Sequence, residues 1–325
     1  MNTTIEVFTF SVRRFRTEDY LSFSENPDLY SLLANDEMNF WKFIDCNMTG
    51  DIPSAGVTVR IPESTAEQVF RHHNDTQRFI CGIIETGAYG KEYEIANKDS
   101  PKEVEYTVNR SSAIIKPFFY YIKIPRSGNK GLMILERTDN NGIYPLMRIV
   151  LTAFINFHFG AENGYNIEKN NVILSSYLEE LQNGRYSSIS LSANSLPTDV
   201  ADRYFGPLDS GDFTLEFKMK FKKNIGEVKE QEIKRIINSG GQLFDSPELN
   251  DIFESASKKV VSTVGSGNRA KPRTFYLGGG EHRNMIRPYY ELEVEQNEKG
   301  FSLYSSIKEA TKQFITDNPD FNILF

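Results

Sequence analysis

The stretch PFFYYIKIPRSGNKGLMILERTDNNGIYPLMRIVLTAFINFHF, residues 117–159, decides the fold. Two apolar runs, 118–124 and 132–136, flank a short turn that contains Pro125 and Gly128. Aromatic and branched residues bounded by Pro and Gly are typical of paired strands. A second Gly turn leads into one long apolar run of helical length. The stretch therefore predicts a β-hairpin followed by a buried helix, and it contains no catalytic signature.

The sharpest alternation of apolar and polar residues lies at 212–222, DFTLEFKMKFK. A period of two predicts a strand with one buried face and one polar face. Alternating strands and short turns favour antiparallel pairing, so we expect an α+β fold with a mixed, mainly antiparallel sheet and helices packed on it. A boundary near 111–116 would separate a strand-rich N-terminal domain, 1–112, from an α+β C-terminal domain, 113–325.

The N-terminal third carries weaker patterns of the same two kinds. Residues 5–15 predict a strand, and residues 27–45 predict a helix. Ser64 and Glu67 have the S-x-x-E spacing of a capping box, which predicts a helix that ends near His72 and His73. An imidazolium at that end would be favoured by the helix dipole.

Composition and charge exclude several classes of protein. The 325 residues carry a formal net charge of −7, so bulk electrostatics do not attract the chain to nucleic acid or anionic membranes, and a nucleic-acid site must be a local basic patch. Two cysteines without metal-ligand spacing fit a reducing cytosol and predict no zinc site and no cofactor. The longest apolar stretch, 143–159, contains Arg148 and Asn156, which make it a poor membrane span. We therefore expect a cytoplasmic protein without a membrane partner.

One candidate site has the residue types of a metal-dependent nuclease. Glu216-Phe217-Lys218 places an E-x-K on the alternating strand, with Asp209 and Asp212 upstream. In nucleases of the PD-(D/E)xK type, carboxylates hold Mg²⁺ and the lysine orients the attacking water. The alternative is a solvated strand face, since E-x-K occurs by chance in any strand with a polar face.

Two basic clusters are candidates for phosphate binding. Lysines two apart on a strand align at about 7 Å spacing, and Gly-rich loops let backbone N–H groups approach an anion. The alternatives are edge protection by lysines and a pair of mobile hairpin loops. The candidate nucleic-acid-binding residues are Lys218, Lys220, Lys222, Arg269, Lys271, Arg273, His282, Arg283 and Arg287.

Three further polar features are weighed against structural roles. His282 follows Glu281 in a Gly-rich loop, but no nucleophile motif accompanies it. His158 lies in the apolar run and is expected to be a satisfied core histidine. Glu136 and Arg137 close an apolar strand, where a structural ion pair is expected.

The segments GLMILERTDNNGIYPLMRIV, YLEELQNGRYSSISLSANSLPTDVADRYFG and DFTLEFKMKFKK follow one another within residues 117–223. This order resembles a loose group of uncharacterised bacterial proteins found in phage-defence contexts, and it is similar in element order to DNA-binding exclusion proteins of temperate phages. The resemblance implies a bacterial cytosolic setting and a role in sensing or binding, and it supplies no catalytic residues. The positions that match are Gly131, Glu136, Arg137, Gly142, Ile143, Tyr177, Leu178, Gly184, Pro197, Asp199, Ala201 and Asp202.

Three hypotheses of function follow, in this order. The first is an anti-phage defence component that binds nucleic acid without catalysis. The second is a protein-binding sensor or subunit of a multi-protein defence complex. The third is the metal-dependent nuclease. The sequence leaves open whether the partner is DNA, RNA, a protein of a defence system or a second copy of the chain.

Overall fold

The computed structural model describes residues 2–24, 26–65, 69–138, 141–160, 164–177, 179, 184–193, 215–221, 231, 257–264, 271–277 and 288–324. Contacts divide the chain into two units, which we call unit 1 (Met1–Asn170 with Tyr289–Phe325) and unit 2 (Asn171–Pro288). The division expected from the sequence, 1–112 and 113–325, differs from this one. Strands on both sides of residue 112 pair with each other in unit 1, and hydrogen bonding between distant segments left no signal in the local composition.

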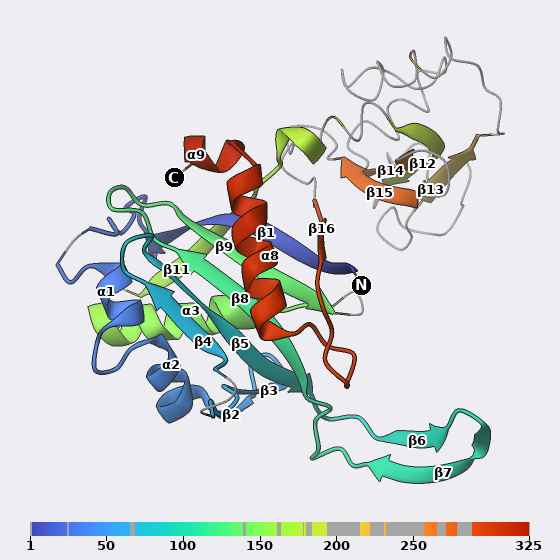
Figure 1. Cartoon of the computed structure of the whole chain (residues 1–325), viewed down its shortest axis with the longest axis horizontal. Helices are drawn as coiled ribbons and strands as arrows, with labels where there is room; N and C mark the ends of the chain where they lie inside the picture. The colour runs from blue at the N-terminus through green and yellow to red at the C-terminus, as the bar shows by residue number, and fades with distance from the viewer. Residues whose placement is uncertain are drawn as a thin grey trace, which may run out of the picture. The chain divides into compact units, whose positions relative to one another are not determined.

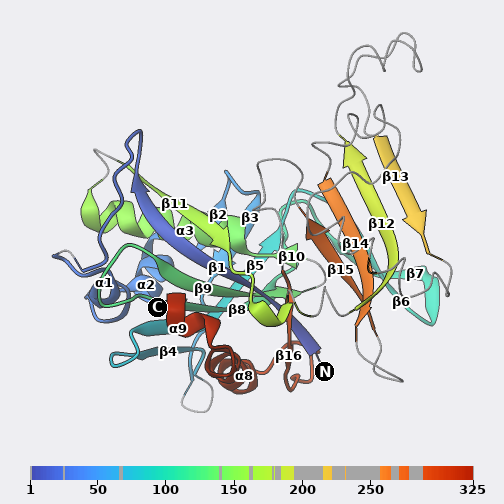
Figure 2. The same cartoon turned by 90° about the horizontal axis from the view of Figure 1, so that it is seen from above.

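Unit 1 is built on one large sheet (Figures 1 and 2). Along its main path the strands are β11 (Tyr165–Asn171), β1 (Asn2–Arg14), β9 (Gly131–Thr138), β8 (Lys116–Lys123), β5 (Phe79–Ala88), β3 (Val57–Arg60) and β2 (Gly50–Ile52). Three short strands pair with strands of this path. They are β10 (Asn141–Gly142), which pairs with β9, β16 (Tyr290–Glu293), which pairs with β1, and β4 (Arg71–Asn74), which pairs with β5. The pairings β1–β9, β9–β8, β8–β5 and β5–β3 are all antiparallel.

Helices cover both faces of this sheet (Figures 1 and 2), which explains why its central strands are apolar at nearly every position. On one face α3 (Tyr144–Phe159), α1 (Leu29–Ala34) and α2 (Phe40–Phe43) pack against side chains such as Tyr120 and Met133. On the other face α8 (Tyr304–Asp317) covers Phe119, whose ring centroid is 6.2 Å from that of Tyr304. The chain ends in α9 (Asp320–Leu324). The predicted β8–β9 hairpin and α3 are confirmed.

Two predictions for the N-terminal third need correction. Residues 27–45 form two short helices instead of one, because Asp28 and Asn39 each cap a separate start, and the π-helical turn η1 (Ile44–Met48) follows. The prediction of a helix after Ser64 is wrong for the described residues 69–74, which contain no helix. His72 and His73 lie in β4, paired with Cys81 and Ile80 of β5, since hydrogen bonding to β5 outweighs the local capping signal.

A separate hairpin, β6 (Tyr93–Asn97) with β7 (Ser100–Val108), leaves the main sheet after β5 and returns to it at β8. We call it the arm. Among the described strands, its two strands pair only with each other, and Tyr93 and Tyr106 remain 43% and 60% exposed. The arm therefore adds little to the core.

Unit 2 contains a four-stranded antiparallel sheet of β13 (Leu215–Lys220), β12 (Arg185–Ala193), β14 (Ser257–Val264) and β15 (Lys271–Leu277), in that order. The alternation expected at 212–222 is confirmed within β13, where half-buried and exposed residues alternate. Together the two units confirm the α+β fold with mainly antiparallel sheets. In the described part of the chain, none of the helices has the length and apolar character needed to cross a membrane.

Candidate functional site

Cationic side chains surround an open cavity of about 680 Å³ at one end of the main sheet of unit 1. We call it the cationic pocket. Its walls also contain Tyr121, Ile124 and Ile315, and none of the described residues that line it is a carboxylate. The cations that line it are Arg78, Lys123, Arg126, Lys130 and Lys312.

Strand pairing brings these distant residues together. Phe79, the first residue of β5, pairs with Lys123, the last residue of β8, so the β4–β5 turn and the β8–β9 loop emerge at the same end of the sheet (Figure 1). Gly128 turns the β8–β9 loop with φ of +88°, a conformation that favours glycine. The last turns of α8 supply Lys312 from the face of the sheet that α8 covers. The pocket is thus built from segments about 50 and 190 residues apart in the chain.

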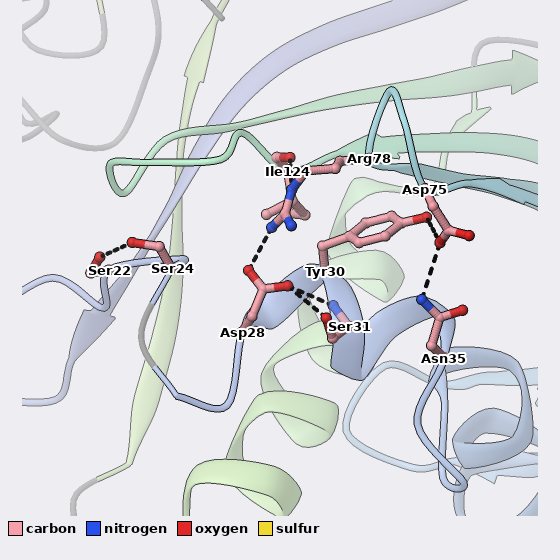
Figure 3. Close-up of polar contacts among 9 residues, drawn as sticks. All are labelled: Ser22, Ser24, Asp28, Tyr30, Ser31, Asn35, Asp75, Arg78 and Ile124. Carbon is pink, nitrogen blue, oxygen red and sulfur yellow. Dashed lines mark hydrogen bonds and ion pairs between the residues drawn. The ribbon is translucent and has the colours of Figure 1, made fainter.

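Arg78 is the most firmly held cation of the pocket (Figure 3). Its Nη2 donates to Asp28 Oδ1 at 2.5 Å and its Nε donates to the Ile124 carbonyl at 3.2 Å. Its guanidinium also lies over the Tyr30 ring, 4.9 Å from the centroid. Burial alone would raise the pKa of Asp28, but the hydrogen bonds from Arg78 and Ser31 hold that pKa below its ordinary value. The guanidinium is therefore oriented before any ligand arrives.

A second polar layer supports this arrangement (Figure 3). Asp75 Oδ1 accepts hydrogen bonds from the Tyr30 hydroxyl at 2.9 Å and from Asn35 Nδ2 at 3.1 Å. These two bonds lower the pKa of Asp75, and burial followed by the bond to Asp75 raises the pKa of Tyr30. The layer fixes α1 and the β4–β5 turn to each other, and hence fixes the ring on which Arg78 rests.

The other cations differ in how strongly their charge is offset. Burial lowers the pKa of Lys123, so part of its hydration has been lost. Lys312 Nζ lies 3.0 Å from Glu309 Oε1, in an exposed ion pair that contributes little to stability. Arg126 and Lys130 are exposed, and among the described residues no ion pair is found for either. The pocket consequently keeps a net positive charge.

The positive surface continues from the pocket toward β4. Burial, and then the charges of Lys308, Lys312 and His73, lower the pKa of His72. The His72 ring centroid lies 5.8 Å from that of Phe79, and Lys312 Nζ lies 5.9 Å from the same Phe79 centroid, so α8 passes near β4. His72 and His73 are thus strand residues at the border of a cationic surface, instead of helix-end residues.

This arrangement suits the binding of an anion. Guanidinium and ammonium groups donate to phosphate oxygens, and a half-buried wall strengthens those interactions. Within the described ranges, no group of three or more His, Cys, Asp or Glu side chains is arranged to hold a metal ion. The described cysteines, Cys46 and Cys81, form no disulfide, and burial raises the pKa of Cys81 to about 11, which makes it a poor nucleophile.

The site residues predicted in unit 2 are only partly described. Glu216, Lys218 and Lys220 share the exposed face of β13, opposite Ser192, Ser190 and Ser188 of β12. Lys271 and Arg273 lie on β15, and β12 and β14 separate that strand from β13. The sheet therefore does not place the two predicted clusters on neighbouring strands. Asp209, Asp212, Lys222, Arg269, His282, Arg283 and Arg287 lie outside the described residues.

Glu136 and Arg137 are structural, but they do not pair with each other. Arg137 Nη1 donates to Glu6 Oε1 at 3.0 Å and lies over the Tyr289 ring. Glu136 is buried and accepts three hydrogen bonds from other segments. Neighbours on a strand point to opposite faces, which explains the separation. His158, expected to be a satisfied core histidine, is half-buried and its Nε2 is 3.1 Å from the Met38 carbonyl oxygen.

The sequence reasoning missed the cationic pocket. The loop 125–130 was recognised only as a Pro/Gly turn, although it holds Arg126 and Lys130. Two cations in a turn are a weak signal, and only the added cations from β5, β8 and α8 make a pocket. Comparison with protein-family models, curated proteins and solved structures gives no match to this chain.

Proposed function

We propose that this protein binds nucleic acid without cleaving it, and that the sugar-phosphate backbone contacts the cationic pocket. The observation that carries the proposal is an open cavity whose described lining contains five cations and no carboxylate. Phosphate contacts position nucleic acids on proteins and supply most of the sequence-independent affinity.

The net charge of −7 does not oppose this proposal. At physiological ionic strength the Debye length is about 8 Å, so exposed charges farther away are largely screened. A phosphate in the pocket therefore interacts mainly with the cations that line it. The acidic remainder of the surface reduces attraction outside the basic patches.

The test is a titration of labelled duplex DNA, single-stranded DNA and RNA over a range of salt, with Mg²⁺ present, read on native and denaturing gels. The double variant Arg126→Ala, Lys130→Ala removes two phosphate contacts. Because each contact to a single strand contributes about 0.7 to the slope of log K against log salt, the slope should fall by about 1.4 and the affinity at 0.1 M salt by about 25-fold.

The matched control is Lys91→Ala with Lys98→Ala, which removes the same charge from exposed positions in or beside the arm. Its slope and affinity should stay close to those of the unmodified protein. Equal losses in the two double variants would show that only net charge matters, and would refute a role for the pocket. Absence of binding to all three nucleic acids would refute the proposed function itself.

The exposed lysines of β13 are proposed to add phosphate contacts in unit 2. The double variant Lys218→Ala, Lys220→Ala should lower the salt slope by a similar amount. An unchanged salt slope would show that these lysines do not contact phosphates and that they only protect an edge strand from unwanted pairing.

The biological setting is proposed on the resemblance alone. A role in bacterial anti-phage defence in the cytoplasm predicts that the gene lowers phage plating in a sensitive host, and that the Arg126→Ala, Lys130→Ala variant loses this protection. If this variant still protects the host, defence against phage does not depend on the pocket. The protein-binding sensor and the nuclease remain predictions, and cleavage on the denaturing gel that Glu216→Ala abolishes would favour the nuclease.

A further inference from the structure

The end of β1 carries exposed aromatic rings beside arginines. Arg13 and Tyr20 form an isolated bridge that closes a turn, which we call the β1 tip (residues 13–20). Phe15 is 51% exposed and Tyr20 is 41% exposed. The guanidinium carbon of Arg16 lies 5.1 Å from the centroid of the Phe15 ring. Exposed aromatic rings and arginine guanidinium groups are the surfaces on which unpaired bases stack.

Backbone and side-chain contacts hold the β1 tip in place. The Phe15 N–H donates to the Gly164 carbonyl at 2.8 Å, and the Arg14 N–H donates to the Asp19 carbonyl at 2.9 Å. Glu168 accepts from the Tyr20 hydroxyl at 2.9 Å and pairs with Arg13 at 2.8 Å. The rings are therefore presented by a fixed turn, which lowers the entropy lost when a ligand stacks on them.

The β1 tip and the cationic pocket lie at the same end of the main sheet. Phe10 of β1 pairs with Gly131, the first residue of β9, so the β1 tip extends past the end where the β8–β9 loop emerges. The Phe23 N–H donates to the Gly128 carbonyl of that loop at 2.9 Å. In the strand order β1-β9-β8-β5, three spacings of about 4.8 Å separate β1 from β5, or about 14 Å. A strand with the ~3.4 Å spacing of B-DNA would cover that distance in about four nucleotides, and a more extended single strand would need fewer.

Two arginines at this end have a backbone conformation that glycine adopts more easily. Arg16 has φ of +62° and Arg78 has φ of +54°, and they are the non-glycine residues with positive φ in the described part of the chain. The left-handed conformation is unfavourable for residues with a Cβ atom. One of these arginines lies at the β1 tip and the other in the cationic pocket. Strain at two cations on one surface favours a role in binding.

The two surfaces supply different interactions. The β1 tip contains Arg13, Arg14 and Arg16, but a similar number of carboxylates accompanies them, namely Glu18 and Asp19 within it and Glu168 beside it. Its charges nearly balance, so its contribution must come from the rings. The described lining of the cationic pocket contains five cations and no carboxylate, so this surface supplies the phosphate contacts.

From this geometry we infer that the ligand is a single-stranded nucleic acid that runs from the cationic pocket to the β1 tip, with an unpaired base stacked on Phe15. The inference rests on the proposed nucleic-acid binding. Bases in a duplex are already stacked on one another, so a protruding ring finds a partner only in a single strand, a loop or an end.

The test compares Phe15→Ala with Tyr106→Ala, which removes an exposed ring from the arm instead. The probes are a pyrimidine oligonucleotide as DNA, the same sequence as RNA, and the corresponding duplex DNA. Phe15→Ala should weaken binding of both single strands by about 5- to 150-fold, the range expected for one base–aromatic stack, with an unchanged salt slope. Tyr106→Ala should change nothing, and Phe15→Trp should restore affinity. Equal affinities of the DNA and RNA strands would show that the protein makes no favourable contact with the ribose 2′-hydroxyl. A preference for RNA would show that it does make such a contact between the pocket and the β1 tip.

The outcomes separate this inference from the proposed function. If Phe15→Ala has no effect, or weakens duplex and single strands equally, the inference is overturned while binding through the pocket stands. If the protein binds none of the three probes, the proposed function fails. If the Arg126→Ala, Lys130→Ala variant binds as well as the unmodified protein, the role of the pocket and this inference fail together. If Phe15→Trp fails to restore affinity although it folds, the ring does not act by stacking.

Discussion

Removal of the Glu136 carboxylate should destabilise unit 1 because it joins segments from both ends of the chain. Glu136 is 4% exposed. Its Oε2 accepts from the Phe119 N–H at 2.8 Å, and its Oε1 accepts from Thr3 Oγ1 at 3.1 Å and from Ser302 Oγ at 2.5 Å. One carboxylate on β9 thus holds β8, the start of β1 and the segment that follows β16.

The magnitude follows from these contacts. Glu136→Ala leaves the buried Phe119 N–H without an acceptor, which costs about 1–3 kcal/mol, and removes two hydroxyl hydrogen bonds worth about 1 kcal/mol each. Relief from burying a charge offsets part of this, so we expect a loss of about 3 kcal/mol. For a unit of about 200 residues the melting temperature should fall by about 6–12 °C. Glu136→Gln can satisfy the same three partners, since its amide accepts on one side and donates to hydroxyl oxygens on the other, and should cost less than about 1 kcal/mol at neutral pH.

The pH dependence gives an independent check. Burial raises the pKa of Glu136, so folding favours the protonated form. The stability that this group contributes is fully present below its unfolded pKa and is lost as the pH rises through the folded value. Glutamine does not titrate. The stability of Glu136→Gln relative to the unmodified protein should therefore increase as the pH rises from about 4 toward 7.

Urea unfolding followed by the fluorescence of Trp41 is the assay. Trp41 is the one tryptophan of the chain, it is 5% exposed, and it reports on unit 1. Equal losses in the Ala and Gln variants would contradict the reasoning, because the charge would then matter more than the hydrogen bonds. A stability difference between Glu136→Gln and the unmodified protein that does not change with pH would also refute it.

Four further predictions follow from the described contacts. Asp28→Asn removes the ion pair that orients Arg78, so thermal unfolding should show a loss of about 1–2 kcal/mol and affinity for nucleic acid should fall; an equal or higher affinity would show that the pocket does not need Asp28 to orient Arg78. Affinity should weaken at alkaline pH as Lys123, whose pKa is lowered by burial, loses its proton, whereas Lys123→Arg should remove this dependence in a fluorescence titration. Replacing arm residues 92–107 by a short Gly-Ser loop should leave the melting temperature within about 2 °C, since the arm's rings are exposed, and a larger drop in calorimetry would show that the arm supports the core. N-ethylmaleimide should modify the exposed Cys46 but not the buried Cys81, which mass spectrometry would detect as one adduct in the native protein and two in urea.

Local patterns predicted the elements with strong periodicity. The β8–β9 hairpin, α3 and β13 follow from runs whose period or composition is decisive over five or more residues. The prediction failed at 64–73, where a capping-box spacing suggested a helix and β4 formed instead, because pairing with a distant strand outweighs a cap worth about 1 kcal/mol. The sequence also predicted a domain boundary that lies within unit 1, because local composition carries no signal that β5 pairs with β8.

The candidate sites show the same contrast between what local sequence patterns reveal and what only the tertiary structure reveals. Sequence reasoning found cations that are close together in the chain, such as Lys218 and Lys220, because a strand repeats every two residues. It could not find the cationic pocket, whose arginines and lysines come from a turn, a strand end, a loop and a helix. The amino-acid sequence by itself therefore determined the α+β class and the regular elements, through periodicity that is local. Only the tertiary structure decided which charges meet, because the register between distant strands sets their separation.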